Sequence, residues 1–553
     1  MKPALAHLLI VPIVLPLLAA ALMLLFDSRR SKFNSFVNIG ATFVGLLVAL
    51  EILRRVDEAD RPGAIGVYLT SNWEAPFGIV LVADRLSALM LALAGAVSLG
   101  SAVYASASWS RAGVYFHPLF QVLVMGLNGA FLTGDLFNLF VFFEVMLAAS
   151  YGLQLHGSGW VRVHSGLHYI AVNLVASSLF LVGLGMIYGV MGSLSMADIA
   201  AKLPHVAEHD RGLLHASASI LAVAFLVKAA IWPLNFWLVP AYAAASAPVA
   251  AIFALMTKVG IYTLLRLWTL LFSEDAGPST HFGASAFVYG GLATIAFGVI
   301  GVIASLRLGR IAGFSVIVSS GTLLTAIGFD AVSVTSAALY YLVSATLAVS
   351  VLFLLVELVE RRAADGPLPL HELDVLPGED TNLDDDETPL VGRMIPIPVA
   401  LLGLAFIACA LLVAGLPPLS GFVAKVALLT ALSRPDELGL ASTPLLAAAV
   451  PWLFGALLVS GLAVTVSMSR AGVRHFWSGS ERVPPRLRFS EGAPVLALLL
   501  ACAWLTFRAE NVMRYMRAAS ESLHSPAGYI DAVMSTKPVP GPTRPFADRE
   551  GPP

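Results

Sequence analysis

The sequence predicts an all-α polytopic membrane protein, and three observations support this fold class. Apolar residues make up 58% of the 553 residues and charged residues only 12%, whereas a soluble domain usually has roughly 25% charged residues. The mean hydropathy is +0.83. Apolar segments of about 20 residues, the length that crosses a bilayer as a helix, recur along the chain. The net charge of -2 gives no indication of nucleic-acid binding.

About 14 transmembrane helices are expected on this length criterion. Their centres lie near residues 15, 44, 95, 123, 145, 177, 225, 256, 295, 318, 346, 410, 456 and 499. The first segment, residues 4–26, precedes the basic residues Arg29 and Arg30. A signal peptide carries its positive charge before the apolar run, so we expect an uncleaved first span. The seventh and eighth segments run almost together between residues 213 and 268.

The distribution of basic residues between the loops predicts the orientation. If the loop after the first span is cytoplasmic, the inside loops carry clearly more arginine than the outside loops, as the positive-inside rule requires. We therefore expect a multi-pass protein of the bacterial inner membrane with both termini outside. The inside residues are Arg111, Arg162, Arg307, Arg310, Arg361, Arg362, Arg393, Arg470, Arg474, Arg482, Arg486 and Arg488, and the outside ones are Arg54, Arg55, Arg61, Lys202, Arg211 and Arg434.

Two segments are expected to lie outside the bilayer. Residues 358–395 form a polar inside loop that is acidic between Glu379 and Glu387, which fits either a solvated linker or docking to a partner protein. The chain after about residue 510 begins as a basic amphipathic stretch with Arg514 and Arg517. It becomes proline-rich from Lys537, where irregular structure is expected.

Four ionisable residues lie inside apolar segments: Glu144, Lys228, Lys258 and Lys425. A charged side chain at the centre of a bilayer costs roughly 2.5–3.5 kcal/mol, so residues of this kind generally serve a function. Lysine and glutamate both carry exchangeable protons. The sequence therefore predicts a path for protons across the membrane.

Helix geometry places Glu144 near the middle of the bilayer. Asp135 after Gly134 is a typical N-cap residue at a surface. Glu144 lies nine residues further on, about 13.5 Å along a helix in a hydrocarbon core about 30 Å thick. A Glu–Lys contact at about 4 Å is worth about 4 kcal/mol at an effective dielectric of 20. Making and breaking such a contact decides whether the lysine keeps its proton.

Prolines near the three lysines predict breaks in the helices that carry them. Pro233 follows the first lysine, Pro248 precedes the second, and Pro417 and Pro418 precede the third. A proline removes a backbone donor and clashes with the preceding turn. Broken helices at membrane depth are tolerated where they are buried or line a watery cavity, so these positions are expected beside an ion path.

The remaining polar residues are weaker candidates. Asp84, Arg85 and Arg266 lie at the ends of apolar segments, where the membrane interface is their expected place. His164 and His168 have i, i+4 spacing, but with no third ligand nearby we predict no metal site. The sequence contains no phosphate loop, dinucleotide fingerprint or nucleophile triad, so no cofactor and no catalytic residue are predicted.

Three stretches carry a resemblance to a known family. They are GDLFNLFVFFEVML at residues 134–147, FLVKAAIWPLNFWLVPAYAAASAPVAAIFALMTKVGIY at 225–262 and AGLPPLSGFVAK at 414–425. They resemble the antiporter-like membrane subunits, which include the proton-pumping subunits of respiratory complex I and the large subunits of Mrp-type (Pha-type) Na⁺/H⁺ antiporters. The resemblance covers roughly residues 80–470 and is strongest to the D subunits of the Mrp type.

This resemblance implies a fold of fourteen helices whose core is two inverted five-helix repeats, spans 4–8 and 9–13, with broken helices 7 and 12 in equivalent places. The implied regions are three N-terminal helices in residues 1–110, a first repeat in 111–270, a second repeat in 271–470 that includes the acidic loop at 358–395, helix 14 in 471–510 and a polar tail in 511–553.

The resemblance also implies roles for the four intramembrane residues. Glu144 and Lys228 match the glutamate–lysine pair of the family, Lys258 matches its central relay lysine, and Lys425 matches the lysine of its second half. The implied partners are the large A protein and the small B, C, E, F and G proteins of the same complex, together with membrane lipid.

One departure from the family pattern lies in the eleventh span. Many relatives carry a histidine just after a Tyr-Tyr or Phe-Tyr pair, whereas ALYYLVSATLAVSVLF has Ser344 and Ala345 there. A titrating relay is therefore not expected at this point. Water held by Ser344 and Thr346 is the predicted bridge.

Three functions are compatible with these residues. The first is a secondary transporter: a proton-translocating subunit of a multisubunit antiporter that exchanges protons for Na⁺ or another monovalent cation, and thus no enzyme. The second is a proton-pumping subunit of complex I or of a membrane-bound hydrogenase. The third is a scaffold with inert lysines. The residues of the three motifs favour the antiporter subunit. The proteins that co-purify with the chain would distinguish it from a subunit of complex I or of a hydrogenase.

Overall fold

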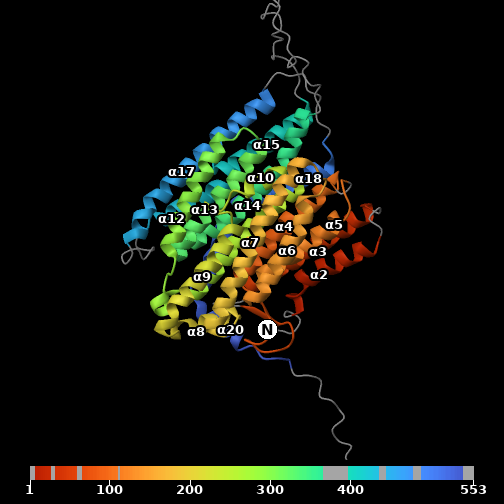
Figure 1. Ribbon diagram of the computed structural model, residues 1–553. Helices are drawn as coiled ribbons and strands as arrows, with labels where there is room; N and C mark the ends of the chain where they lie inside the picture. Colours follow the sequence, from red (N-terminus) through yellow and green to blue (C-terminus); the bar gives the residue numbers. More distant parts are fainter. Residues whose placement is uncertain are drawn as a thin grey trace, which may run out of the picture.

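The computed structural model describes residues 7–26, 31–58, 65–109, 112–364, 396–434, 444–477 and 487–539. The chain forms a bundle of long helices with α2 and α3 on one side and α12 and α17 on the other (Figure 1). Twelve of the described helices are long and apolar enough to cross a membrane, and three further apolar helices are shorter. The prediction of an all-α polytopic membrane protein is confirmed. The acidic stretch between Glu379 and Glu387 lies outside the described residues.

The helices follow the predicted apolar segments closely. Two predicted spans, those centred near residues 225 and 410, are each divided into two helical pieces by a non-helical segment. The helices are α2 (Val11–Leu25), α3 (Ser31–Asp57), α4 (Arg85–Ala105), α5 (Phe116–Leu132), α6 (Leu136–Gln154), α7 (Trp160–Met191), α8 (Met196–Lys202), α9 (Glu208–Lys228), α10 (Leu238–Ala244), α11 (Ala247–Leu271), α12 (Ala284–Ala304), α13 (Leu308–Phe329), α14 (Val332–Ala364), α15 (Ile397–Ala414), α16 (Ser420–Leu432), α17 (Pro444–Gly472), α18 (Phe489–Phe507), α19 (Ala509–Leu523) and α20 (Pro526–Met534).

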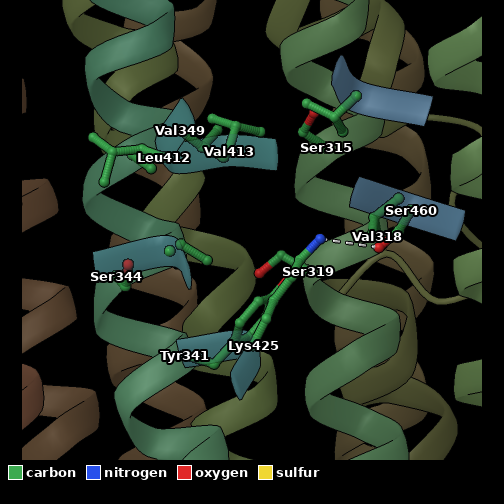
Figure 2. A pocket seen from close by; sticks show the side chains of 14 residues that line it. Ser315, Val318, Ser319, Tyr341, Ser344, Val349, Leu412, Val413, Lys425 and Ser460 are labelled. Atoms are coloured by element: carbon green, nitrogen blue, oxygen red, sulfur yellow. Dashed lines mark hydrogen bonds between the residues drawn. The ribbon is translucent and has the colours of Figure 1, made fainter. Parts of the chain in front are cut away.

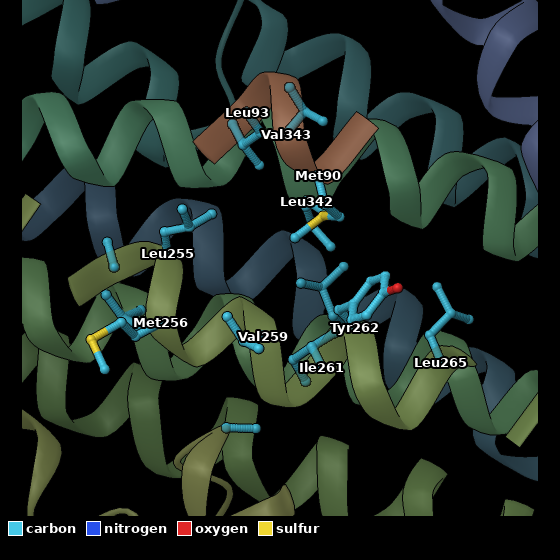
Figure 3. Close-up of a cluster of buried hydrophobic side chains, with 14 of the residues drawn as sticks. Met90, Leu93, Leu255, Met256, Val259, Ile261, Tyr262, Leu265, Leu342 and Val343 are labelled. Atoms are coloured by element: carbon cyan, nitrogen blue, oxygen red, sulfur yellow. The ribbon is translucent and has the colours of Figure 1, made fainter. Parts of the chain in front are cut away.

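The centre of the bundle is α11, which is buried along its whole length. It packs against α4, α13 and α14. Figure 3 shows Leu255 and Val259 of α11 in the same cluster of buried apolar side chains as Met90 of α4 and Leu342 of α14. A helix with apolar side chains on all of its faces is stable only where other helices bury all of those faces. Lys258 lies on this helix, so its side chain starts from the most buried element of the fold.

One end of the bundle, which we call the α20 end, is covered by short elements. It holds α8 and α20 (Figure 1), and α20 contacts β1 (Gly66–Leu69), which pairs antiparallel with β2 (Val80–Ala83). Asp84 and Arg266, which the sequence places at the membrane interface, form a buried ion pair with both contacts at 2.6 Å. The ring of Tyr529 in α20 lies 5.3 Å from the Arg266 guanidinium. This pair fixes α4 to α11.

The amphipathic stretch predicted after residue 510 forms α19, which packs on α14 at the α20 end. Its C-terminus is held by Asp330, the C-cap residue of α13. Nδ1 of His281 donates to Asp330 Oδ2 at 2.8 Å, and Nε2 of His524 lies 3.3 Å from Asp330 Oδ1. Two imidazoles from distant parts of the chain therefore converge on one carboxylate.

These contacts move the pKa values of the three groups. Burial raises the pKa of Asp330, but the two histidines outweigh it and hold that pKa at about 2. The hydrogen bond to Asp330 raises the pKa of His281 against the effect of burial. Burial lowers the pKa of His524, but Asp330 outweighs it, and the charge of Glu274 adds to the net rise. The cluster is therefore strongest when both histidines are charged and Asp330 is ionised.

We expect the hold of this cluster on α19 to weaken at alkaline pH. The histidine contribution is complete below their unfolded pKa of about 6.5 and is lost as pH rises through the raised folded values. The thermal unfolding midpoint of His524→Gln should fall further below that of the wild type at about pH 5.5 than at about pH 8.5. Equal differences at both pH values would contradict this assignment.

Candidate functional site

Lys228 is the last residue of α9, at a break in the helix. Residues 229–237 are not helical, and Ala230 has a left-handed backbone (φ 56°). Pro233 lies within this segment, where it has no backbone N–H to offer to a continuing helix. Lys228 is only 4% exposed. The unpaired carbonyls at a helix C-terminus carry partial negative charge, which favours an ammonium group at that position.

A serine connects Glu144 to Lys228. The hydroxyl of Ser177 in α7 donates to Glu144 Oε1, and Lys228 Nζ donates to the same hydroxyl at 3.3 Å. No ion pair joins Glu144 directly to Lys228 in the described part of the chain, although the sequence predicts a contact between them. The Nζ atom also lies 5.1 Å from the ring centre of Phe143, a cation–π contact. We call Glu144, Ser177 and Lys228 the first-break triad.

Helix α6 holds Glu144 in the way the sequence predicts. Asp135 is the N-cap, and its carboxylate accepts from the Asn138 backbone N–H at 2.8 Å. Phe143, beside Glu144, packs with Phe180 and Phe225. These aromatic side chains close one side of the first-break triad with apolar surface.

Lys258 lies on α11, close to the first break. Its Nζ donates to Ser320 Oγ of α13 at 3.3 Å, and the residue is 2% exposed. Gly260, on the same helix, allows a close approach: a Cβ there would lie 2.9 Å from the Ala229 backbone nitrogen. The absence of a side chain at Gly260 thus brings α11 directly onto the backbone that follows Lys228.

Lys425 lies beside the second break. Helix α15 ends at Ala414, and α16 begins at Ser420, with Pro417 and Pro418 between them. The Lys425 ammonium donates to Ala414 O at 2.9 Å. It also faces the Leu457 carbonyl at 3.3 Å and the Ser460 hydroxyl at 3.4 Å, both on α17. An ammonium group has three donors, and three acceptors surround this one.

A cavity of about 30 Å³ adjoins the Lys425 side chain (Figure 2), large enough for about two water molecules. Ser344 lies on its wall and shares a 2.8 Å hydrogen bond with Ser420. Thr346, the second predicted water-holding residue, is not among the lining residues, and its hydroxyl donates to Leu342 O of its own helix. The lining residues are Ser315, Val318, Ser319, Tyr341, Ser344, Ala345, Ala348, Val349, Leu412, Val413, Gly421, Lys425, Ser460 and Val464.

Pro248 does not break a helix. It lies in the first turn of α11, after the N-cap Ser246. A proline is accepted there because the first N–H groups of a helix have no intrahelical partner. The prediction of a break at Pro248 is therefore wrong, whereas Pro233, Pro417 and Pro418 lie in non-helical segments.

The site residues that the sequence misses are the hydroxyls. Ser177 joins the first-break triad, Ser320 receives Lys258, and Ser460 receives Lys425. Serine is common in membrane helices and carries no charge, so composition alone does not single these residues out. These serines can be identified only after the positions of the lysine side chains are known, because an ammonium group inside the bundle requires nearby acceptors.

Comparisons with known proteins match most of the chain. Residues 133–450 match the family described as "NADH:quinone oxidoreductase/Mrp antiporter, TM". The chain is 50% identical over 533 residues to the D subunit of a probable K⁺/H⁺ antiporter from Rhizobium meliloti, covering 96% of this chain and 98% of the relative. It is 32% identical to the D subunit of the Na⁺/H⁺ antiporter from Alkalihalophilus pseudofirmus, covering 96% and 99%. A chain of the Mrp complex from Dietzia sp. superposes with a TM-score of 0.80 at 27% identity, covering 97% and 100%.

We expect the absence of a side chain at Gly461 to be required for the Lys425 ammonium to reach the Ala414 carbonyl. A Cβ at position 461 would lie 2.9 Å from Lys425 Nζ and 2.9 Å from Ala414 O. We expect Gly461→Ala to lower the thermal unfolding midpoint, since crowding a packed interior typically costs about 1–3 kcal/mol. Gly455→Ala on the same helix meets nothing within 4 Å and is the matched control. If the two variants unfold at the same temperature, the close approach at Gly461 does not exist.

Proposed function

We propose a function from the premise that the chain belongs to the NADH:quinone oxidoreductase/Mrp antiporter family and, within it, to the D subunits of Mrp antiporters. The chain moves protons as one member of a multisubunit antiporter that exchanges them for a monovalent cation. It is a secondary transporter and no enzyme. The observation that carries the proposal is a set of three lysines inside the helix bundle: Lys228 and Lys258 are buried, and Lys425 is partly buried. Lys228 and Lys425 lie at helix breaks, and Lys258 lies on the central helix.

The first-break triad is the proposed switch. The Ser177 hydroxyl donates to Glu144 and accepts from Lys228, so it transmits the charge of one residue to the other. A protonated Lys228 is stabilised by this arrangement. When the arrangement opens, the ammonium is left in an apolar surrounding and its proton is released to the next acceptor. We propose that Lys258 accepts the proton next and that Lys425 accepts it after Lys258.

The transported cation is the open part of this proposal. The relative at 50% identity is named for K⁺ and the one at 32% for Na⁺. Both cations are therefore tested in the transport assay. That Na⁺ is the transported cation stays a prediction. Protons moving inward through this chain drive the cation outward through the assembled complex.

The proposed assembly follows the family. The twelve long helices together with α2 and α5 make fourteen spans, with α10 completing the span of α9 and α16 that of α15. The two breaks then fall in spans 7 and 12, which supports two inverted five-helix repeats. Both termini lie outside in this arrangement, and the partners are the large A protein and the small B, C, E, F and G proteins of the complex.

A second candidate is a proton-pumping subunit of complex I or of a membrane-bound hydrogenase. The family description covers quinone oxidoreductases as well as antiporters, and the site residues serve either. The two antiporter relatives favour the first function. Purification of the chain with its natural partners separates the two: co-purifying antiporter proteins support the first, and quinone-reductase proteins support the second.

Glu144→Ala and Lys228→Ala should each abolish cation-dependent proton antiport without preventing assembly. Residues that act as one switch are non-additive, so the double variant should be little worse than either single one. The measurement is collapse of ΔpH in everted vesicles on addition of Na⁺ or K⁺, with protein levels checked. Substantial activity in both single variants, with multiplied losses in the double, means that the two residues work independently.

The serine of the triad offers a matched pair of variants for the same assay. Ser177→Ala removes the hydroxyl between Glu144 and Lys228 and should lose most of the transport. Ser178→Ala removes an exposed hydroxyl that donates only to Leu174 O of its own helix, and it should behave as wild type. Equal activity of the two variants would remove Ser177 from the switch.

Lys425→Arg should lose most transport although it keeps the charge. Arginine does not release its proton at usable pH, so it can hold the site but cannot pass the proton on. Lys202→Arg, at a surface lysine that pairs with Asp198, is the matched control and should transport normally. The assay uses vesicles with a clamped membrane potential. Wild-type rates in Lys425→Arg would make Lys425 a fixed charge with no relay role.

A further inference from the structure

The gap between Lys258 and Lys425 is spanned by one helix, α13. It packs against α11, which carries Lys258, and against α14 and α17 on the side of the Lys425 cavity. Five of its residues carry hydroxyls: Ser315, Ser319, Ser320, Thr322 and Thr325. The neighbouring stretch of α14 around Ser344 contains no histidine. The polar side chains that α13 places between Lys258 and Lys425 are therefore hydroxyls.

Most of these hydroxyls are already engaged. Ser315 donates to Ile311 O at 2.8 Å, Thr322 to Val318 O and Thr325 to Gly321 O, each at 2.9 Å. These are bonds to the carbonyl four residues earlier, and they satisfy the hydroxyl within its own helix.

The other two hydroxyls are adjacent in sequence and point to different neighbours. Ser320 Oγ accepts from Lys258 Nζ at 3.3 Å. Ser319 lines the Lys425 cavity, is 2% exposed, and makes no well-formed hydrogen bond within the described residues, although the Tyr341 hydroxyl lies near it at the same cavity. A buried hydroxyl without a well-formed hydrogen bond is unfavourable unless water supplies one, and this hydroxyl borders a cavity with room for about two waters.

We propose that Ser319, together with Ser320 and water in the cavity, carries the proton from Lys258 to Lys425. This inference rests on the proposed function and adds the residues that connect the two lysines. Figure 2 shows Ser319, Lys425 and Ser460 at the same cavity. Ser344 is the less suited hydroxyl, since it is already bonded to Ser420.

The transfer balances without any oxidation or reduction. The Lys258 ammonium gives a proton to the Ser320 oxygen, which releases its own hydroxyl proton toward Ser319 through water. The Ser319 oxygen does the same toward the cavity water, which protonates the neutral amine of Lys425. Each serine ends as a hydroxyl, Lys258 ends neutral and Lys425 ends as an ammonium. A hydroxyl is suited to this because it donates and accepts at once.

The test compares Ser319→Ala with Ser315→Ala in the whole antiporter complex. Both serines line the cavity, but Ser315 is satisfied within its own helix. We expect Ser319→Ala to slow antiport about tenfold, less than the full 10²–10⁴-fold that a positioned proton-transfer group supplies, because water substitutes in part. The half-saturating cation concentration should not change, and the ratio of rates in H₂O and D₂O should rise. Ser319→Thr, which keeps the hydroxyl, and Ser315→Ala should stay near wild type.

A wild-type rate in Ser319→Ala, with Lys425→Ala inactive, overturns the relay while the proposed function stands. A wild-type rate in Lys425→Ala as well overturns the proposed function itself. If Ser319→Ala does not assemble, Ser319→Cys decides, since it keeps the volume but is a weak donor and acceptor. Slow transport in the cysteine variant with a raised isotope ratio supports the relay, and a wild-type rate overturns it.

Discussion

The structure depends on one requirement: an ammonium group away from water must be surrounded by oxygen. An unbroken apolar helix offers little, because most of its carbonyls are used by its own backbone. Breaking a helix is the direct solution. At the second break, the last residue of α15 is Ala414, and its carbonyl accepts from Lys425. The proline pair after it keeps the helix from continuing and consuming that carbonyl. The lysine and the break are therefore parts of a single site.

The same requirement explains what lies around the other two lysines. Lys258 is on an unbroken helix, so its acceptor comes from a neighbour, Ser320 of α13. Lys228 terminates α9 and receives a serine hydroxyl and the face of an aromatic ring. Gly260 lets α11 reach the backbone after Lys228 without a side chain between them. Packing at the centre of the bundle is thus arranged around polar groups, although almost every surrounding side chain is apolar.

The sequence reveals the residues whose burial costs much free energy or that interrupt a helix. It does not reveal the serines, which cost little in a membrane helix. Buried lysines cost several kcal/mol and prolines stop helices, so Lys228, Lys425, Pro233 and Pro417 stand out in an apolar chain. A serine in a membrane helix satisfies itself on its own backbone and leaves no pattern, so the bridging position of Ser177 appears only in three dimensions. The break predicted at the proline of α11 fails for a related reason: proline also favours the first turn of a helix, and sequence alone does not distinguish the two.

The two breaks differ in what holds the lysine, and under the proposed function this difference gives the two lysines different tasks. Lys228 is tied through Ser177 to a carboxylate, whose charge changes when Glu144 takes or loses a proton. Lys425 is held by two backbone carbonyls and a hydroxyl, which are dipoles of fixed strength. The hold on Lys228 can therefore be switched by local charge. The hold on Lys425 cannot be switched in this way, so its proton affinity must be changed by what enters the cavity beside it. In the proposed relay, water in that cavity would deliver the proton and, by solvating the ammonium, would alter how tightly the proton is kept.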